Sequence, residues 1–189
     1  MCRGMLVAAG IVAVAVAAGC HKNNRDPAGP SWPISSADLK EGQPVDVKFT
    51  CDGADLSPAL AWPPPPTGTQ SLALIMDDPD APSGTFTHWL LYDVPADRTS
   101  VAQGVEKTGE VRGLGRQGQN GFEKLGYGGP CPPPGKPHHY RFTLHALSAK
   151  LDLAAGANRA AVDKALAGKV LAQTQLTVTY QRAAKQEKK

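Results

Sequence analysis

The chain has 189 residues, which is about the length of one domain. Apolar residues make up 41% and charged residues 20%, so the chain can bury a sizeable core and is not disordered as a whole. The net charge of +3 is too small to indicate a nucleic-acid partner, and no apolar run in the body of the chain is long enough for a transmembrane bundle. The 20 glycines and 17 prolines predict many turns, and therefore strands rather than long helices.

The N-terminus has the pattern of an export signal. Arg3 supplies a positive charge, an apolar stretch follows at residues 5–18, and small residues precede Cys20. Residues 1–19 are therefore predicted to be a signal peptide. Because Ala17-Ala18-Gly19-Cys20 resembles a bacterial lipobox, Cys20 is predicted to receive a lipid and to become the first mature residue. The alternative is an ordinary cleaved signal with a cysteine nearby.

A lipid on Cys20 would place the protein in the bacterial cell envelope, with that lipid as its only contact with the membrane. Residue 21 is His rather than Asp, so the usual signal for retention at the inner membrane is missing. We therefore predict anchoring in the outer membrane, facing the periplasm. The predicted organisation of the mature chain is a flexible tether at 20–33, one domain at 34–182 and a disordered basic tail at 183–189.

Hydrophobic patterning predicts five strands and one helix in the body of the chain. The predicted strands alternate apolar and polar residues or are continuously apolar, and they lie at residues 45–49, 71–76, 88–94, 140–146 and 173–181. Val162, Leu166 and Val170 recur at every fourth position, which predicts an amphipathic helix over 158–171 with Asn158 as its N-cap. These elements indicate a mainly β fold, an antiparallel β-sandwich with one or two short helices.

An acidic loop directly follows a predicted buried strand. Asp77, Asp78 and Asp80 crowd together there, and Pro79 and Pro82 fix the backbone. Because neighbouring carboxylates repel one another, at least one is expected to have a raised pKa or to bind a positive group. A solvated turn whose aspartates cap their own backbone is equally compatible with the sequence.

Three further segments carry candidate functional residues. His88 lies at the start of a strand, although a core histidine with satisfied hydrogen bonds is the alternative. In the long Gly-rich stretch, residues 126–135 combine glycines, which let a backbone approach a ligand, with prolines, which stiffen it; a structural hairpin loop is the alternative. His138 and Tyr140 are predicted to share one face of a strand, with His139 on the other.

Three other motifs are rejected. The segment GLGRQG at 113–118 matches GxGxxG, but no buried strand precedes it and no helix follows, so no cofactor is predicted. Cys131, His138 and His139 lack a second ligand pair at zinc-finger spacing, so no metal is predicted. No serine lies in a GxSxG elbow, and no catalytic residue is assigned.

The order of several motifs is more specific than any one of them. The chain contains, in sequence, FTCDGADLSPALAW at 49–62, DPDAP at 78–82, His88-Trp89, GPCPP at 129–133 and HHYRF at 138–142. In this order they resemble the phosphatidylethanolamine-binding protein family, in its bacterial Raf-kinase-inhibitor-like branch, over residues 34–182. The resemblance implies a β-sandwich with a small surface pocket for anions, lined by Asp78, Asp80, His88, Pro132 and His138, with Tyr140 nearby.

Two cysteines remain for a disulfide once the signal peptide is cleaved and Cys20 is acylated. Cys51 and Cys131 both lie in Gly- and Pro-rich loops, and an exported protein meets an oxidising compartment. They are predicted to pair with each other. Two separate buried thiols are the alternative.

Three functions compete at this point. The leading hypothesis is a binding or inhibitory module that holds a small anionic ligand, such as phosphate or a phosphorylated headgroup, with a kinase or a protease as the kind of protein partner expected. The alternative is a hydrolase of a small phosphate or ester with His88 or His138 as general base, and the third is a purely structural lipoprotein. Anion binding is expected to strengthen as the pH falls from about 8 to about 5.5, with the aspartates holding the histidine protons to a higher pH than usual.

Overall fold

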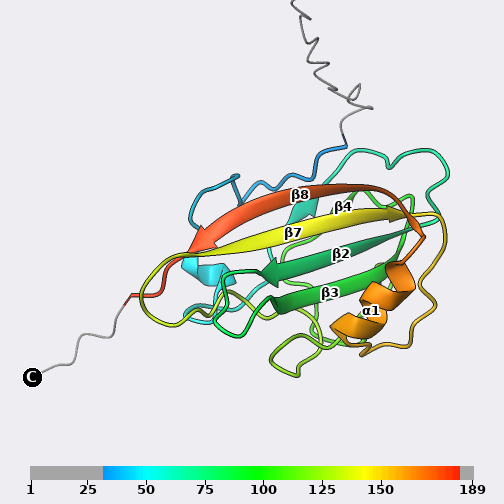
Figure 1. Cartoon of the computed structure of the whole chain (residues 1–189). Helices are drawn as coiled ribbons and strands as arrows, with labels where there is room; N and C mark the ends of the chain where they lie inside the picture. Colours follow the sequence, from blue (N-terminus) through cyan, green and yellow to red (C-terminus); the bar gives the residue numbers. More distant parts are fainter. Residues whose placement is uncertain (1–31, 184–189) are drawn as a thin grey trace, which may run out of the picture. The chain divides into compact units, whose positions relative to one another are not determined.

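The computed structural model describes residues 32–183, which form a mainly antiparallel β domain with one α-helix (Figure 1). Its main sheet has six strands in the order β5-β6-β3-β2-β7-β8, and β1 and β4 form a separate two-stranded sheet. All neighbouring strands run antiparallel. The elements are η1 (Val47–Phe49), β1 (Leu60–Ala61), β2 (Ser71–Asp78), β3 (Phe86–Pro95), β4 (Ser100–Val101), β5 (Glu110–Val111), β6 (Gly115–Gln117), β7 (His138–Leu147), α1 (Arg159–Leu166) and β8 (Val170–Tyr180).

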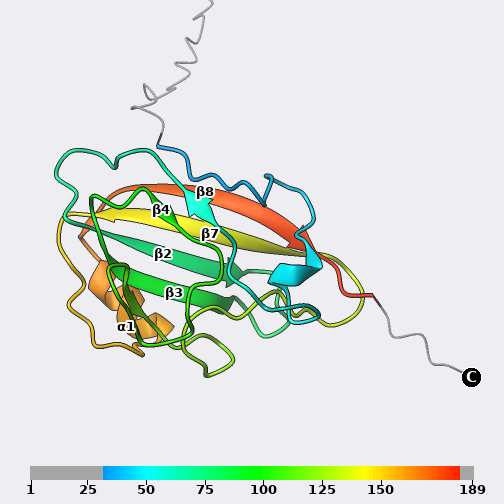
Figure 2. The same ribbon diagram turned by 180° about the vertical axis from the view of Figure 1, so that it is seen from behind.

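Two hydrophobic clusters cover opposite faces of the main sheet. Successive residues of β2 show the alternation, because Leu74 packs in one cluster with Leu60 of β1, whereas Ile75 packs in the other with Val162 of α1. Figures 1 and 2, seen from opposite sides, show the helix on one face and the β1–β4 pair on the other. The predicted mainly β, antiparallel class is confirmed, with a second layer that consists of a short sheet and extended segments.

The N-terminal part of the domain pairs with the last strand. Residues 42–45 run beside β8, where the Val45 amide donates to the Thr179 carbonyl at 2.8 Å and the Thr179 amide donates to the Gln43 carbonyl at 3.0 Å. Because β8 is an outer strand of the six-stranded sheet, these bonds occupy part of its free edge.

The segment 45–49 is not the strand that its alternation predicted. It contains the 3₁₀ turn η1, which begins after Asp46, and the Asp46 carboxylate accepts a hydrogen bond from the Lys48 amide at 2.9 Å. This local side-chain cap competes successfully with strand pairing. As a result Val47 is exposed, although Phe49 is fully buried.

Helix α1 begins where the sequence predicts and ends earlier. The Asn158 side chain accepts a hydrogen bond from the Ala161 amide at 3.0 Å, which confirms it as the N-cap. The helix ends at Leu166 because Gly168, with φ of 74°, turns the chain back toward the sheet. Val170 therefore begins β8 and does not extend the predicted apolar stripe of the helix.

The predicted signal peptide and the proposed lipid site at Cys20 lie outside the described residues, as do residues 184–189 of the predicted tail. Trp32, which falls in the predicted tether, is instead buried in the core, and its indole nitrogen donates to the Pro63 carbonyl at 2.8 Å. Among residues 32–183, no helix has the length and apolarity that crossing a membrane requires.

Candidate functional site

Three strand ends meet at one end of the main sheet. Strand β2 runs antiparallel to both β3 and β7, so its last residues lie beside the first residues of both neighbours. The pairing of Asp78 with Phe86 fixes this register on the β3 side. Asp78, His88 and His138, which are far apart in the sequence, are thereby brought to one cavity.

A β-bulge turns His88 toward this cavity. Met76 of β2 pairs with Trp89 of β3, but the next residue, Asp77, pairs with Thr87, so His88 is an extra residue between them. A bulge of this kind shifts the alternation of a strand by one residue. Strict alternation would have turned His88 toward the face covered by α1, whereas the bulge places its ring against the aromatic side chains of the opposite face.

We call this cavity the histidine pocket. Its volume is about 130 Å³, and it is lined by Asp78, Ala81, Pro82, Ser83, Phe86, His88, Phe122, Cys131, Pro132, Pro133 and His138. Four of the six residues that the family resemblance implied therefore line one cavity. Of the other two, Tyr140 lies next to it, with its ring centroid 5.1 Å from that of His88, and Asp80 lies outside.

The Asp78 carboxylate holds the His138 ring in place. Nδ1 of His138 lies 2.7 Å from Oδ2 of Asp78, and both side chains are almost completely buried. The other oxygen of Asp78 accepts a hydrogen bond from the Asp80 amide at 2.8 Å. Because the carboxylate occupies Nδ1, the ring nitrogen of His138 that remains for a ligand is Nε2.

A backbone carbonyl holds His88 in the same way. Nδ1 of His88 lies 2.7 Å from the carbonyl oxygen of Gly128, which can only accept, so Nδ1 carries a hydrogen and Nε2 remains free. Burial lowers the pKa of His88 below its usual 6.5, although the Gly128 carbonyl and Asp78 act in the opposite direction. This corrects the expectation of a proton held to a higher pH, because the loss of hydration outweighs the attraction of the carboxylate.

The acidic loop gives each carboxylate a partner of its own. Asp77 pairs with Arg159 of α1 on the opposite face of the sheet, so it binds a positive group as the sequence predicted. Asp80 is exposed, and its Oδ2 accepts a hydrogen bond from the His139 amide at 2.8 Å and lies 2.7 Å from Nδ1 of the same residue. These two hydrogen bonds lower the pKa of Asp80. The carboxylates therefore point in different directions and do not crowd.

The first residues of β7 alternate as predicted. His138 and Tyr140 are buried on one face, and His139 is exposed on the other. The Tyr140 hydroxyl is buried and makes no hydrogen bond of normal geometry with the residues described here. Burial, together with the nearby Asp78 carboxylate, raises the pKa of Tyr140, so its hydroxyl stays protonated throughout the physiological range.

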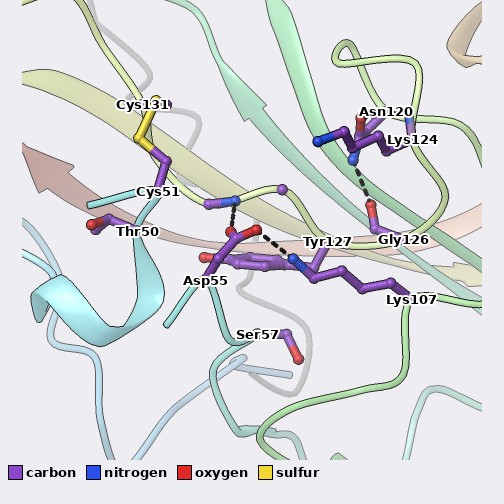
Figure 3. A network of polar contacts seen from close by, with 12 residues as sticks. Thr50, Cys51, Asp55, Ser57, Lys107, Asn120, Lys124, Gly126, Tyr127 and Cys131 are labelled. Carbon is purple, nitrogen blue, oxygen red and sulfur yellow. Dashed lines mark hydrogen bonds and ion pairs between the residues drawn. A yellow bond between two sulfur atoms is a disulfide. The ribbon is translucent and has the colours of Figure 1, made fainter. Parts of the chain in front are cut away.

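The Gly- and Pro-rich wall of the histidine pocket is bonded to an earlier loop. Cys51 and Cys131 form a disulfide with their Cα atoms 5.4 Å apart, which confirms the predicted pairing. Beside it, Oδ1 of Asp55 accepts a hydrogen bond from the Gly129 amide at 2.6 Å (Figure 3). The disulfide, this hydrogen bond and the hydrogen bond from the Cys51 amide to the Pro130 carbonyl at 3.1 Å therefore fix the position of this wall.

The sequence analysis missed the aromatic part of the pocket. Phe86 and Phe122 meet edge to face with ring centroids 4.7 Å apart, and both rings also contact the His88 ring. Phe122 comes from the long Gly-rich stretch and is 39% exposed. The only available signal was an aromatic residue in a segment with little other apolar content.

A larger cavity, of about 440 Å³, lies at the other end of β3. Only part of its charge is paired: Arg116 contacts both Asp93 and Glu110 at 3.3 Å, whereas Arg112, Lys150 and Asp152 form no ion pair among the described residues. No histidine is among its lining residues. The histidine pocket, with two imidazole nitrogens left for a ligand, is the better candidate for the functional site.

The chain is similar over most of its length to bacterial proteins. A UPF0098 protein of Aquifex aeolicus is 46% identical over 151 residues, which cover 79% of this chain and 88% of that protein. LppC of Mycobacterium tuberculosis, named as a candidate lipoprotein, is 37% identical over 156 residues, which cover 82% of this chain and 75% of that protein.

Solved structures share the fold. YbcL of E. coli, described as a new member of the mammalian PEBP family, matches with a TM-score of 0.74 at 30% identity, covering 80% of this chain and 98% of YbcL. CT736 of Chlamydia trachomatis, described as a homologue of the same family, matches with a TM-score of 0.73 at 29% identity, covering 82% and 99% of the two chains. The family model for phosphatidylethanolamine-binding protein matches residues 35–181. This match spans nearly the whole described domain, and the chain belongs to the phosphatidylethanolamine-binding protein family.

Proposed function

We propose that this protein is a lipid-anchored envelope protein whose histidine pocket binds a small phosphate-like anion, and that it acts as a binding or inhibitory module. The observation that carries the proposal is the pair of imidazoles. His88 and His138 line one small cavity, and each is held through Nδ1, so that Nε2 remains for a ligand. A neutral Nε2 accepts a hydrogen bond from a protonated oxygen, and a protonated one donates to a charged oxygen. A phosphate group offers both kinds of oxygen.

The carboxylate of Asp78 has partners of its own in this cavity. One oxygen accepts from the Asp80 amide and the other lies against Nδ1 of His138, so both oxygens are hydrogen-bonded within the protein. The remaining lining residues are largely apolar, including Phe86 and Phe122. Apolar walls exclude water, and hydrogen bonds to a ligand are stronger where water is excluded.

Phosphate binding is expected to strengthen as the pH falls from about 8 to about 5.5. Burial lowers the pKa of His88 below its usual 6.5, so the ring is neutral over the upper part of this range, and an anion bound at Nε2 favours uptake of a proton there as the pH falls. Each proton taken up on binding raises the affinity by up to about tenfold per pH unit. Calorimetric titration with inorganic phosphate measures this profile. Sulfate, whose charge is constant over the range, separates protonation of the protein from protonation of the ligand.

The histidine variants test the same profile. His88→Gln should flatten it, because glutamine cannot take up a proton, and His138→Gln should weaken binding, because it removes the other imidazole nitrogen offered to the ligand. His139→Gln is the matched control, since His139 is exposed and paired with Asp80 on the other face of β7. Equal affinity at both ends of the range, or tighter binding at high pH, would contradict an anion pocket.

An assay of phosphate release tests the alternative that this protein is a hydrolase. Ser83 is the only hydroxyl-bearing residue that lines the histidine pocket, and within residues 32–183 no hydrogen bond links it to His88 or His138. A phosphomonoester that shifts the melting temperature without release of phosphate would support a binding protein, whereas release abolished by Ser83→Ala would support the hydrolase.

An inhibitory effect on a kinase or a protease stays a prediction. A pull-down from the native envelope tests whether such a partner binds.

The lipid anchor is supported by the relative named as a lipoprotein and by the sequence Ala17-Ala18-Gly19-Cys20. Mass spectrometry of the native N-terminus should find an acylated Cys20 with residues 1–19 removed. Cys20→Ser should release the protein from the membrane fraction, and His21→Asp should shift it from the outer to the inner membrane. An unmodified Cys20 in the native protein would contradict the anchor.

A further inference from the structure

A second cavity lies directly against the histidine pocket. Its volume is about 250 Å³, and it is lined by Cys51, Asp55, Lys107, Asn120, Phe122, Lys124, Tyr127, Gly128, Gly129 and Cys131; we call it the lysine pocket. Phe122 and Cys131 line both cavities. One aromatic ring and one disulfide therefore form the boundary between the two.

The Lys107 ammonium is held in position at this second cavity (Figure 3). It pairs with Oδ2 of Asp55, whose other oxygen accepts the Gly129 amide at 2.6 Å. The ammonium also lies 6.0 Å from the centroid of the Tyr127 ring. One oxygen of this carboxylate thus bonds a backbone amide and the other pairs with Lys107. The Lys107 ammonium keeps further N–H donors for a ligand.

Lys124 supplies a second positive charge, and it has no carboxylate partner in the described part of the chain. Its backbone is fixed by Asn120, which is buried, accepts the Lys124 amide at 3.2 Å through Oδ1 and donates to the Gly126 carbonyl at 2.9 Å. In Figure 3 the two lysine side chains come from separate loops and extend toward the same side, that of the disulfide.

The two cavities differ in charge. The lysine pocket contains two ammonium groups and one carboxylate, Asp55, so it is positive. The histidine pocket contains the carboxylate of Asp78, and burial of His88 lowers the pKa of that ring, which keeps it neutral at pH 7. The lysine pocket therefore attracts a second anionic group of a ligand whose first group lies in the adjacent histidine pocket.

We propose that the two cavities form one bipartite site for a small ligand that carries two anionic groups on a short apolar linker. This inference rests on the proposed function, because a terminal phosphate occupies the histidine pocket. The second group, a carboxylate or another phosphate, pairs with Lys107 and Lys124. Phe122, which lines both cavities, packs against the linker. A small phosphorylated hydroxy acid has this chemistry.

A series of paired ligands tests the proposal. Phosphonoacetate and its homologues with longer methylene linkers carry both groups, and alkylphosphonates of the same length lack only the carboxylate. Calorimetric titration of the purified protein, at a fixed pH below neutrality, gives the ratio of the two affinities at each length. At the length that spans the two pockets, we expect the carboxylate to increase the affinity about tenfold, as a charge-assisted hydrogen bond in a partly enclosed site does.

The lysine variants identify the residues that recognise the carboxylate. Lys107→Gln and Lys124→Gln should each reduce the tenfold ratio toward one, whereas Lys164→Gln, on the helix that covers the other face of the sheet, should leave it unchanged. His88→Gln should weaken both members of each pair alike and so preserve the ratio. This pattern would assign the phosphonate to the histidine pocket and the carboxylate to the lysine pocket.

The possible failures are distinguishable. If alkylphosphonates bind and the carboxylate adds nothing at any linker length, the bipartite site is wrong and the anion pocket stands. If the carboxylate increases the affinity but both lysine variants keep that increase, the assignment to the lysine pocket is wrong. If no member of the series binds, the proposed function fails and the bipartite site fails with it.

Discussion

Removal of the disulfide between Cys51 and Cys131 is expected to lower the free energy of unfolding by about 4 kcal/mol. The bridge closes a span of 80 residues, for which the loss of chain entropy in the unfolded state gives about 4.5 kcal/mol as an upper value. Phosphate affinity should fall together with stability, because the bridge also fixes the wall of the histidine pocket. The change in stability is measured by urea unfolding of the Cys51→Ser/Cys131→Ser double variant, compared with the unreduced protein. Calorimetry measures the phosphate affinity of both.

Reduction of the unmodified protein provides the control for this experiment. With dithiothreitol present, it should unfold at the same urea concentration as the double variant, and the double variant should not respond to the reductant. A difference of less than about 1 kcal/mol between the bridged and unbridged proteins would show that the hydrogen bonds between the two loops, from Gly129 to Asp55 and from Cys51 to Pro130, hold them together without the bridge.

Gly129→Ala should also have a large effect. A Cβ atom at this position would lie 2.4 Å from the Phe49 carbonyl oxygen and 2.8 Å from Oδ1 of Asp55. Because the nearest atom is backbone, the wall itself must move, which costs about 2–3 kcal/mol of stability. The Gly128 carbonyl that holds the His88 ring moves with the wall, so phosphate affinity should fall as well.

The neighbouring Gly128→Ala is a matched comparison. Its Cβ atom would lie 2.8 Å from the Phe122 ring and 3.1 Å from the Asn120 side-chain nitrogen. Phe122 is partly exposed and can rotate away, so we expect a loss of less than about 1 kcal/mol. Thermal or urea unfolding measures the loss of stability in both variants. Equal losses would mean that the backbone contact at Gly129 does not account for the effect of the added Cβ atom.

The long strands could be predicted because each is long enough to show either regular alternation or a continuous apolar run. Leu176 and Val178 of β8 are buried as their alternation indicated, and the apolar run that forms β2 is buried on both faces. The segment 45–49 shows the same alternation over a shorter length, and there the Asp46 cap produces a turn. The short strands β5 and β6 contain too few residues to show any periodicity.

The candidate site was predictable from the order of its motifs, and its geometry was not. Asp78 and His138 could be placed at neighbouring strand ends, but the bulge that turns His88 toward them depends on the register between β2 and β3. Lys107 and Lys124 line one cavity because two separate loops pack around Tyr127. No local pattern records such packing between loops, so neither lysine could be selected from the sequence.

The pairing of residues 42–45 with β8 has a consequence for how copies of this protein meet one another. An exposed sheet edge offers unpaired backbone groups to any neighbouring chain and favours aggregation. Here the N-terminal segment covers part of one edge, and the other edge strand, β5, has only two residues, Glu110 and Val111. Residues 42–45 occupy the β8 edge at Thr177 and Thr179, so they shorten the stretch of β8 that a neighbouring chain could extend, and β5 is too short to pair with one.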